Sequence, residues 1–286
     1  MNDRDARVIL FSCIEGGNVF WTREVEEIGA VETINKAREN GYHSTVHEKI
    51  ATRISTTSSK EQLSRIQEAH LEFIVPEDAT WPLGVNDLVA PPFGLTIKGD
   101  STILALPSLA IVGTRNPTNY GVRAAGEFAS GFADRDWVIT SGGAYGIDAA
   151  AHRGALVAEG STIAILACGI DINYPAGHMR LFAEICESGA LVSEVMPGVH
   201  AIPARFLTRN RLIAAISSAT LVVEAAFRSG SLRTARDAAE LLRPVMAVPG
   251  PITSPTSEGC HRLIGERAAE IVTSVADAVE FVSTSK

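Results

Sequence analysis

The chain has 286 residues, of which 46% are hydrophobic, and it carries a formal net charge of −8. This length and apolar content suit one large globular domain and a small one, and no run approaches the ~18 consecutive apolar residues of a membrane span. The N-terminus lacks the charged-then-apolar layout of a signal peptide, and the four cysteines have neither metal-ligand nor disulfide-framework spacing. We therefore expect a cytoplasmic protein without a bound metal or a membrane partner.

Residues 1–68 are polar and of mixed charge, and they predict a small helical domain. Helix-like stretches cover residues 23–40 and 58–70. The hydroxyl residues at 56–59 would supply the N-cap of the second stretch, with Glu61 or Gln62 placed for a capping box. No residue of this segment suggests chemistry. A proline-punctuated stretch then predicts a transition into a larger domain, and we assign residues 69–286 to that domain.

From about residue 95 the pattern alternates between strand, small-residue turn and helix. The strand candidates are short continuous apolar runs, as expected for strands buried on both faces. These runs are Leu109–Val112, Trp137–Thr140, Thr162–Leu166, Leu191–Ser193, Leu221–Val223 and Val245–Val248. Helical spacing recurs between them. The alternation predicts an α/β fold with a doubly wound, mostly parallel sheet, whose ligands bind beyond the carboxyl ends of the strands.

Two loops at that edge favour an anion. Each follows an apolar strand and opens a helix; the first contains Gly113, Thr114 and Arg115, and the second contains Ser141 and Gly142. Such loops point backbone N–H groups and the positive end of a helix dipole beyond the strand ends. Arg115 adds a planar donor fork that suits phosphate oxygens. The sequence therefore predicts a site for phosphate groups along this edge.

The charge is unevenly distributed. Residues 200–243 contain seven arginines and three acidic residues, a balance of +4, although the whole chain is acidic. A strongly acidic chain taken alone argues against a nucleic-acid partner. A basic stretch whose cations are all arginines is compatible with one, although solvated helix faces would give the same composition.

Motifs of nucleotide-dependent enzymes are missing. After the first strand a dinucleotide fingerprint needs closely spaced glycines, but the next glycine after Gly113 is Gly121, and Arg115, Asn116 and Pro117 fill the gap. The chain also has no G-K-[ST] sequence of a P-loop. We therefore predict no nucleotide cofactor.

Candidate catalytic residues are few. Asp148 and His152 are four residues apart on one predicted helix and could form an acid–base pair, but a structural contact explains them as well. Glu224 follows a buried strand and could be a general base. It could equally accept the guanidinium of one of three arginines, Arg211, Arg228 or Arg233. No residue stands out as a nucleophile with its base, so we predict no catalytic residue.

Several runs resemble the DprA/Smf family of DNA-processing proteins, in order and at compatible spacing over about residues 90–274. They are Ala110–Pro117 with Tyr120-Gly121, Ser141-Gly142 with Gly146–Ala155, Arg209–Ala214, Val222–Ala225, Arg228–Leu232 with Thr234-Ala235, Ala247–Gly250 and Gly259–Ile264. The resemblance implies an extended Rossmann-like fold, with residues 1–68 as a small SAM-like helical domain.

The resemblance also implies function. It implies a homodimer that binds single-stranded DNA without sequence preference and helps to load a RecA-type recombinase, with no catalytic turnover. The DNA-contacting residues carried over from the family are Gly113, Thr114, Arg115, Ser141, Gly142, Arg205, Phe206, Arg209 and Arg211. Single strands are held by phosphate contacts and by bases stacked on aromatic rings, and Phe206 between arginines suits both.

Three departures from the family pattern weaken this expectation. Many members have a leucine and an arginine where this chain has Gly143 and Tyr145, and many have a lysine at the place of Pro203. We expect no C-terminal winged helix, because the chain stops at Lys286. The alternative is an enzyme of the lysine-decarboxylase-like Rossmann class, which would bind a nucleotide or hydrolyse a nucleoside monophosphate with Glu224 as its base.

Overall fold

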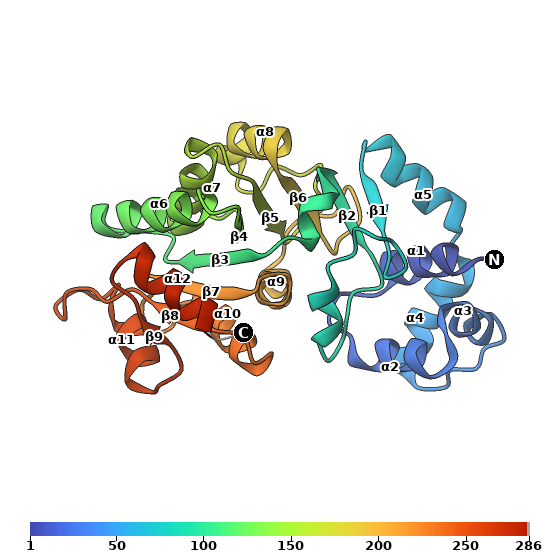
Figure 1. Ribbon diagram of the computed structural model, residues 1–286. Coiled ribbons are helices and arrows are strands. Elements are labelled where there is room, and N and C mark those ends of the chain that lie inside the picture. The colour runs from blue at the N-terminus through green and yellow to red at the C-terminus, as the bar shows by residue number, and fades with distance from the viewer. Residues whose placement is uncertain (285–286) are drawn as a thin grey trace.

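The computed structural model describes residues 1–284 of the chain and is shown in Figure 1. Its α-helices are α1 (Asp3–Cys13), α2 (Val19–Ile28), α3 (Ala30–Arg38), α4 (Thr45–Thr56), α5 (Ser59–Glu68), α6 (Asn119–Ala133), α7 (Ile147–Val157), α8 (Met179–Ser188), α9 (Pro203–Ile216), α10 (Ser231–Glu240), α11 (Glu258–Gly265) and α12 (Val275–Thr284). Its strands are β1 (Glu72–Ile74), β2 (Leu95–Gly99), β3 (Ser108–Gly113), β4 (Val138–Ser141), β5 (Thr162–Leu166), β6 (Ala190–Ser193), β7 (Ala219–Val223), β8 (Val245–Ala247) and β9 (Glu270–Ile271). Short 3₁₀ helices span Leu83–Asp87, Ser101–Ala105 and Ala176–His178.

The N-terminal region is helical, as the sequence predicts, but its helices are shorter and more numerous. The expected helix over residues 23–40 is divided at Gly29, whose φ of +86° is a backbone conformation that favours glycine. The N-cap prediction for the second stretch is confirmed, because the side chain of Ser58 accepts a hydrogen bond from the Glu61 N–H.

The strands form one sheet in the order β1-β2-β6-β5-β4-β3-β7-β8-β9. All six predicted strands are present, and the pairings from β6 through β9 are parallel. The pattern of apolar runs missed β1, β2 and the short β9. β1 pairs antiparallel with β2, and β2 pairs antiparallel with β6. The predicted α/β fold with a mostly parallel, Rossmann-like sheet is thus confirmed.

Helices cover both faces of the sheet (Figure 1), with α6, α7 and α8 above it and α9 and α10 below it in that view. Alternate residues of each central strand serve the two layers. On β3, Leu109 and Ile111 pack in the cluster that contains α6 and α7 residues, whereas Ala110 and Val112 pack in the cluster that contains α9 and α10 residues. Burial on both faces explains why these strands are continuous apolar runs.

The N-terminal helices share an apolar cluster with one end of the sheet. The ring of Phe11 on α1 lies 5.2 Å from that of Phe73 on β1, and the cluster continues to Leu166 on β5 and Phe182 on α8. The division of the chain at residue 68 stays a prediction, and the last two residues of the predicted second domain, 285 and 286, lie outside the described residues.

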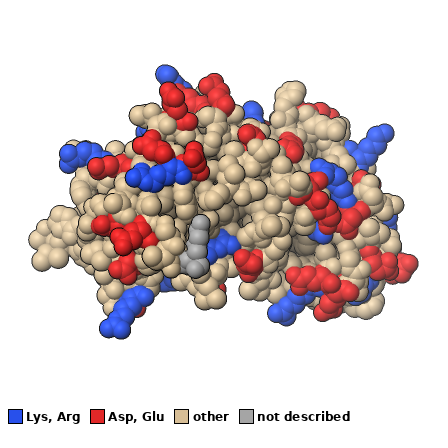
Figure 2. Space-filling model, viewed as in Figure 1, with Lys and Arg blue, Asp and Glu red and all other residues tan. Residues whose placement is uncertain are grey.

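The surface and the helices bear on possible partners. On the face shown in Figure 2, basic and acidic side chains are interspersed and no large basic area stands out. Within residues 1–284, no helix has both the length and the apolar character that crossing a lipid bilayer requires.

Candidate functional site

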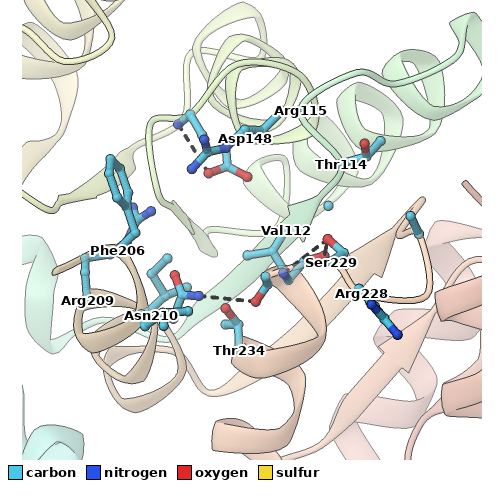
Figure 3. A pocket seen from close by; sticks show the side chains of 17 residues that line it. Val112, Thr114, Arg115, Asp148, Phe206, Arg209, Asn210, Arg228, Ser229 and Thr234 are labelled. Atoms are coloured by element: carbon cyan, nitrogen blue, oxygen red, sulfur yellow. Dashed lines mark hydrogen bonds between the residues drawn. The ribbon is translucent and has the colours of Figure 1, made fainter. Parts of the chain in front are cut away.

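A groove of about 400 Å³ opens at the carboxyl ends of the central strands, the edge at which the sequence predicts a ligand. Three loops and three helices form its walls: the β3–α6, β4–α7 and β7–α10 loops, α9, and the starts of α7 and α10. Figure 3 shows Arg115 and Phe206 on one side of it and Arg228 on the other. The groove thus collects side chains that lie more than 100 residues apart in the chain.

The β3–α6 loop exposes its arginine to the groove. The guanidinium of Arg115 lies 5.2 Å from the centre of the Phe206 ring, a cation–π distance, and the residue is exposed. Among residues 1–284, no carboxylate forms an ion pair with it. Arg115 is therefore a cation available to a phosphate, next to an aromatic ring.

Glu224 anchors this loop from beneath. Its carboxylate accepts hydrogen bonds from the Thr118 N–H at 2.8 Å and from the Thr118 hydroxyl at 2.6 Å. It lies so close to Gly121 that a Cβ there would stand 2.2 Å from Glu224 Oε2. None of the three candidate arginines pairs with it in the described residues, and these donors and the Thr256 hydroxyl satisfy a carboxylate that is only 4% exposed. Glu224 holds the loop that presents Arg115.

The β4–α7 loop is closed upon itself rather than open to a ligand. Ser141 is fully buried and donates its hydroxyl hydrogen to Ile111 O at 2.6 Å. The N–H groups of Gly142 and Ala144 both point to Asp148 Oδ2, at 3.1 and 3.3 Å. The predicted cradle of free N–H groups is therefore wrong for this loop, since the Asp148 carboxylate already occupies the place of an anion.

Arg209 lies behind this loop and supports it. It is 7% exposed, and its Nη1 donates to Gly142 O at 2.5 Å and also to Ile165 O. A Cβ on Gly142 would stand 2.1 Å from Nη1, so any other residue here would displace the guanidinium from its present place. Burial lowers the pKa of the Arg209 guanidinium and raises that of the nearby Asp148 carboxyl, and each charge counteracts the shift of the other. Arg209 lines the groove, but its hydrogen bonds position the loop.

The two flanking arginines of α9 are ion-paired. Arg205 Nε donates to Glu15 at 2.9 Å, and Arg211 Nη2 donates to Glu194 at 2.6 Å. Glu15 comes from the N-terminal helical region. Burial raises the pKa of Glu194, and the adjacent Arg211 opposes that rise. These pairs leave Arg205 and Arg211 less available to an external anion than the sequence suggests.

Residues 200–243, the arginine-rich stretch, present fewer unpaired cations in the structure than the sequence suggests. Five of its seven arginines already have partners. Arg209 donates to backbone carbonyls. The other four form ion pairs: Arg205 with Glu15, Arg211 with Glu194, Arg233 with Asp237 and Arg243 with Asp87. In the described part of the chain, Arg228 and Arg236 have neither an ion pair nor a side-chain hydrogen bond. Arg228 is exposed on the wall opposite Arg115, so these two residues are the cations that the groove offers.

Comparison with known proteins identifies the family. The family model for DNA recombination-mediator protein A matches residues 72–283. A DprA protein of Mycobacterium tuberculosis is 42% identical over 268 residues, 89% of this chain and 69% of that protein. The DNA processing protein DprA of Streptococcus pneumoniae is 37% identical, over 77% of this chain and 79% of that protein. This chain belongs to the DprA family. The resemblance seen in the sequence is confirmed.

Two solved DprA structures share the fold. The X-ray structure of the Streptococcus pneumoniae protein superposes with a TM-score of 0.84 at 28% identity and covers 98% of both chains. A structure of the Helicobacter pylori protein, described for its single-stranded DNA binding mode, gives a TM-score of 0.67 at 31% identity, over 76% of this chain and 96% of that one. The match to the Streptococcus pneumoniae structure includes the N-terminal helices as well as the sheet.

Four of the seven DprA-like runs contribute residues to the groove, together with residues that the sequence reading did not select. Arg228 belongs to one of those runs and follows β7, so its place after a parallel strand could have marked it. Asn210 donates through Nδ2 to Gly230 O at 3.2 Å and joins α9 to the β7–α10 loop. Tyr145 and Tyr174 line a small cavity beside Arg115 and Phe206, and only their loop positions hinted at this.

Asp148 and His152 do not act as a pair. His152 is fully buried, and its Nδ1 lies 2.7 Å from the Thr162 hydroxyl. That hydroxyl gives its hydrogen to Ile139 O, so Nδ1 must be the donor and Nε2 carries no proton. Nε2 has no hydrogen-bond partner, and burial lowers the pKa of His152 to about 3. The imidazole is a neutral structural group that bridges α7 and β5.

Proposed function

We propose that this DprA-family chain binds single-stranded DNA without sequence preference, and that the groove at the carboxyl ends of β3, β4 and β7 holds the strand. The observation that carries the proposal is the exposed Arg115 guanidinium over the ring of Phe206, with no acid paired to it in the described residues. The Helicobacter pylori relative, known for its single-stranded DNA binding mode, supports it.

The chemistry of a single strand explains why this pair matters. A strand offers a phosphate for every base, and its unpaired bases expose flat faces that stack on aromatic rings or guanidinium planes. Arg115 would bind a phosphate through a charge-assisted hydrogen bond, and Phe206 beside it would face a base. Arg228 on the opposite wall would take a second phosphate.

The other predicted residues would contribute in different ways. Thr114 shares the loop of Arg115, and Gly113 permits close packing, since a Cβ there would stand 2.1 Å from Val223 O. Arg209 would shape the floor of the groove through its hydrogen bond to Gly142 O, and Ser141 would hold the same loop through its hydrogen bond to Ile111 O. Arg205 and Arg211 would add long-range attraction while ion-paired, or direct contacts if their acids released them.

The finer role follows from the family resemblance. We propose that the chain acts as a homodimer and delivers single-stranded DNA to a RecA-type recombinase, without catalytic turnover. Glu224 was the candidate base of the alternative hydrolase. Its carboxylate is bound to Thr118, which favours the binding role.

The test is a gel-shift titration of labelled oligo-dT, with duplex DNA and free nucleotides as competitors. If three to five phosphates are contacted, the logarithm of the binding constant should fall against the logarithm of salt concentration with a slope of roughly −2 to −4, from about −0.7 per phosphate. Binding that is insensitive to salt, or that prefers duplex DNA or mononucleotides, would refute the proposal.

A further inference from the structure

A second groove, of about 870 Å³, runs between α6 and α7, which lie side by side above the sheet in Figure 1. We call it the helix groove and define it by residues 120–130 of α6 and residues 150–157 of α7. It shares no lining residue with the groove at the strand ends. At about 1.5 Å per residue, its longer wall extends about 15 Å, the length of a helix of about ten residues.

The helix groove is apolar and uncovered. Tyr120 is 41% exposed, Val122 is 44% exposed and Val157 is 84% exposed. Buried alanines, Ala124 and Ala150, also line it. Single apolar side chains at a surface are ordinary, but three around one groove form a patch of the kind that marks an interaction site.

The glycine in the middle of α6 has no counterpart within this chain. The helix contains three glycines. A Cβ on Gly121 would stand 2.2 Å from Glu224 Oε2, and a Cβ on Gly131 would stand 2.6 Å from Val275 Cγ1 of α12, so packing explains both. A Cβ on Gly126 would meet nothing within 4 Å. Since glycine inside a helix is less stable than alanine, the open space above Gly126 suits a close approach from outside the chain.

Each wall of the helix groove carries an arginine without a partner. Arg123 on α6 and Arg153 on α7 are both exposed, and within residues 1–284 neither side chain forms an ion pair or a hydrogen bond. Glu127 is the acidic residue among those that line the groove, which leaves a balance of +1 in a chain whose net charge is −8. Charge complementarity therefore favours an acidic occupant.

The shape of the groove selects a helix over other acidic ligands. None of its polar side chains is buried, so it lacks the enclosed polar groups that orient a small molecule. For a single strand, Val122 and Val157 offer no flat ring on which a base could stack, and Glu127 would repel phosphates. A helix can instead place apolar side chains at i, i+3, i+4 and i+7 in such a groove, and helices approach most closely where side chains are small, as at Gly126.

We propose that the helix groove docks an acidic, amphipathic helix of a partner protein, which crosses α6 at Gly126 and places its carboxylates opposite Arg123 and Arg153. This inference goes beyond the proposed DNA binding and does not depend on it, because the two grooves have separate residues.

The experiment uses two synthetic peptides of about 12 residues, long enough to fill the groove. Both are stapled as helices on their outer face and have leucines at i, i+3, i+4 and i+7. One has glutamates beside the leucines, and the other has lysines at the same positions. Fluorescence anisotropy at low salt should show that the acidic peptide binds the wild type at least about 10-fold more tightly, because like charges at an interface are unfavourable.

Two variants assign the binding to the groove. Gly126→Leu fills the open space and should weaken the acidic peptide by more than about 10-fold, although leucine favours the helix and the melting temperature should not fall. Gly265→Leu is the matched control, because a Cβ on this helical glycine of α11 also meets nothing within 4 Å but lies outside the groove. Arg153→Glu should reverse the preference, so that the lysine peptide binds more tightly.

Binding of DNA separates this inference from the proposed function. Gly126→Leu should bind oligo-dT as the wild type does, and Arg115→Ala should bind the acidic peptide as the wild type does. A wild type that bound the peptide but not oligo-dT would refute the proposed function and leave the docking site standing. Loss of oligo-dT binding in Gly126→Leu would instead assign the helix groove to DNA and overturn the inference.

Three further results would overturn it. The first is a wild type that binds neither peptide, or both equally. The second is an equal loss of peptide binding in Gly126→Leu and Gly265→Leu. The third is self-association of the wild type, measured by sedimentation, that Gly126→Leu abolishes, because a second copy of this chain would then occupy the groove.

Discussion

The β3–α6 loop and helix α9 both bring arginines to the groove, but they hold them differently. On α9, Arg205 and Arg211 face acids, and Arg209 is buried on backbone carbonyls. On the loop, Arg115 faces solvent and the ring of Phe206. The arginines of α9 thus join distant segments of the chain, whereas Arg115 on the loop remains exposed and available to an anion. An arginine-rich stretch in a sequence does not by itself make a cationic surface, because ion pairs cancel its charge.

The largest expected effect is on stability, and it comes from breaking the buried ion pair between Arg211 on α9 and Glu194. Arg211 and Glu194 have side chains that are only 14% and 10% exposed. Arg211→Met should lower the free energy of unfolding by about 3–5 kcal/mol, because it leaves the Glu194 charge buried and unmatched. The double variant Arg211→Met, Glu194→Leu should lose much less, because no lone charge remains. Urea unfolding of both variants measures the difference, and equal losses would contradict the buried-pair account.

The pH dependence of that single variant follows from the pKa of Glu194. Burial already raises this pKa, and Arg211 opposes the rise, so removing Arg211 raises it further. A carboxyl whose folded pKa lies above its unfolded value binds more protons in the folded state. The stability of Arg211→Met should therefore recover, relative to wild type, as the pH falls from about 7 towards the unfolded pKa. Unfolding curves at several pH values test this sign.

In contrast to Arg211, Arg115 should matter for DNA binding and hardly at all for stability. Arg115→Ala removes a charge-assisted phosphate contact of roughly 1.5–3 kcal/mol, on the order of 10- to 100-fold in DNA affinity. Its melting temperature should hardly change, because an exposed loop arginine adds little to the core. Titration with labelled oligo-dT and a thermal melt measure the two effects. A large fall in melting temperature with unchanged DNA binding would assign Arg115 to structure.

Glu224 tests whether the loop must be anchored for Arg115 to act. Glu224→Gln keeps the shape but loses the charge that accepts two hydrogen bonds from Thr118. We expect a loss of about 1–2 kcal/mol in the free energy of unfolding and DNA binding weakened by a smaller factor than in Arg115→Ala. The wild type should release no free base from nucleoside monophosphates. Base release that Glu224→Gln abolishes would instead support a hydrolase.

The smallest expected effect is on DNA affinity, and it comes from breaking the ion pair between Arg205 on α9 and Glu15. Glu15 is 66% exposed and holds Arg205, and the hydrogen bond with Arg205 lowers the pKa of Glu15. Glu15→Gln should free Arg205 for the DNA and strengthen binding by about 2- to 5-fold, the modest scale of surface ion pairs. Oligo-dT titration at low salt measures it, with Glu184→Gln, on an exposed pair of α8, as the matched control. Weaker binding by Glu15→Gln would mean that the pair positions α9.

The sequence by itself determined the local elements and the family. Continuous apolar runs predict the six central strands because a strand buried on both faces needs such residues at every position. The hydroxyl residues at 56–59 predict a helix start because an N-cap needs a side-chain acceptor. The glycine loops locate the edge of the sheet at which the groove opens, because parallel strands end together. These signals act over a few residues, so they are readable without the fold.

Only the tertiary structure decided which groups are free to bind. Glu15 and Arg205 are 190 residues apart, and no local pattern relates them. The N–H groups of the β4–α7 loop are taken by Asp148, and Glu224 by Thr118, because buried polar groups must find partners among whatever the fold brings near. Local propensity shapes the elements, whereas charge neutralisation and burial depend on long-range packing.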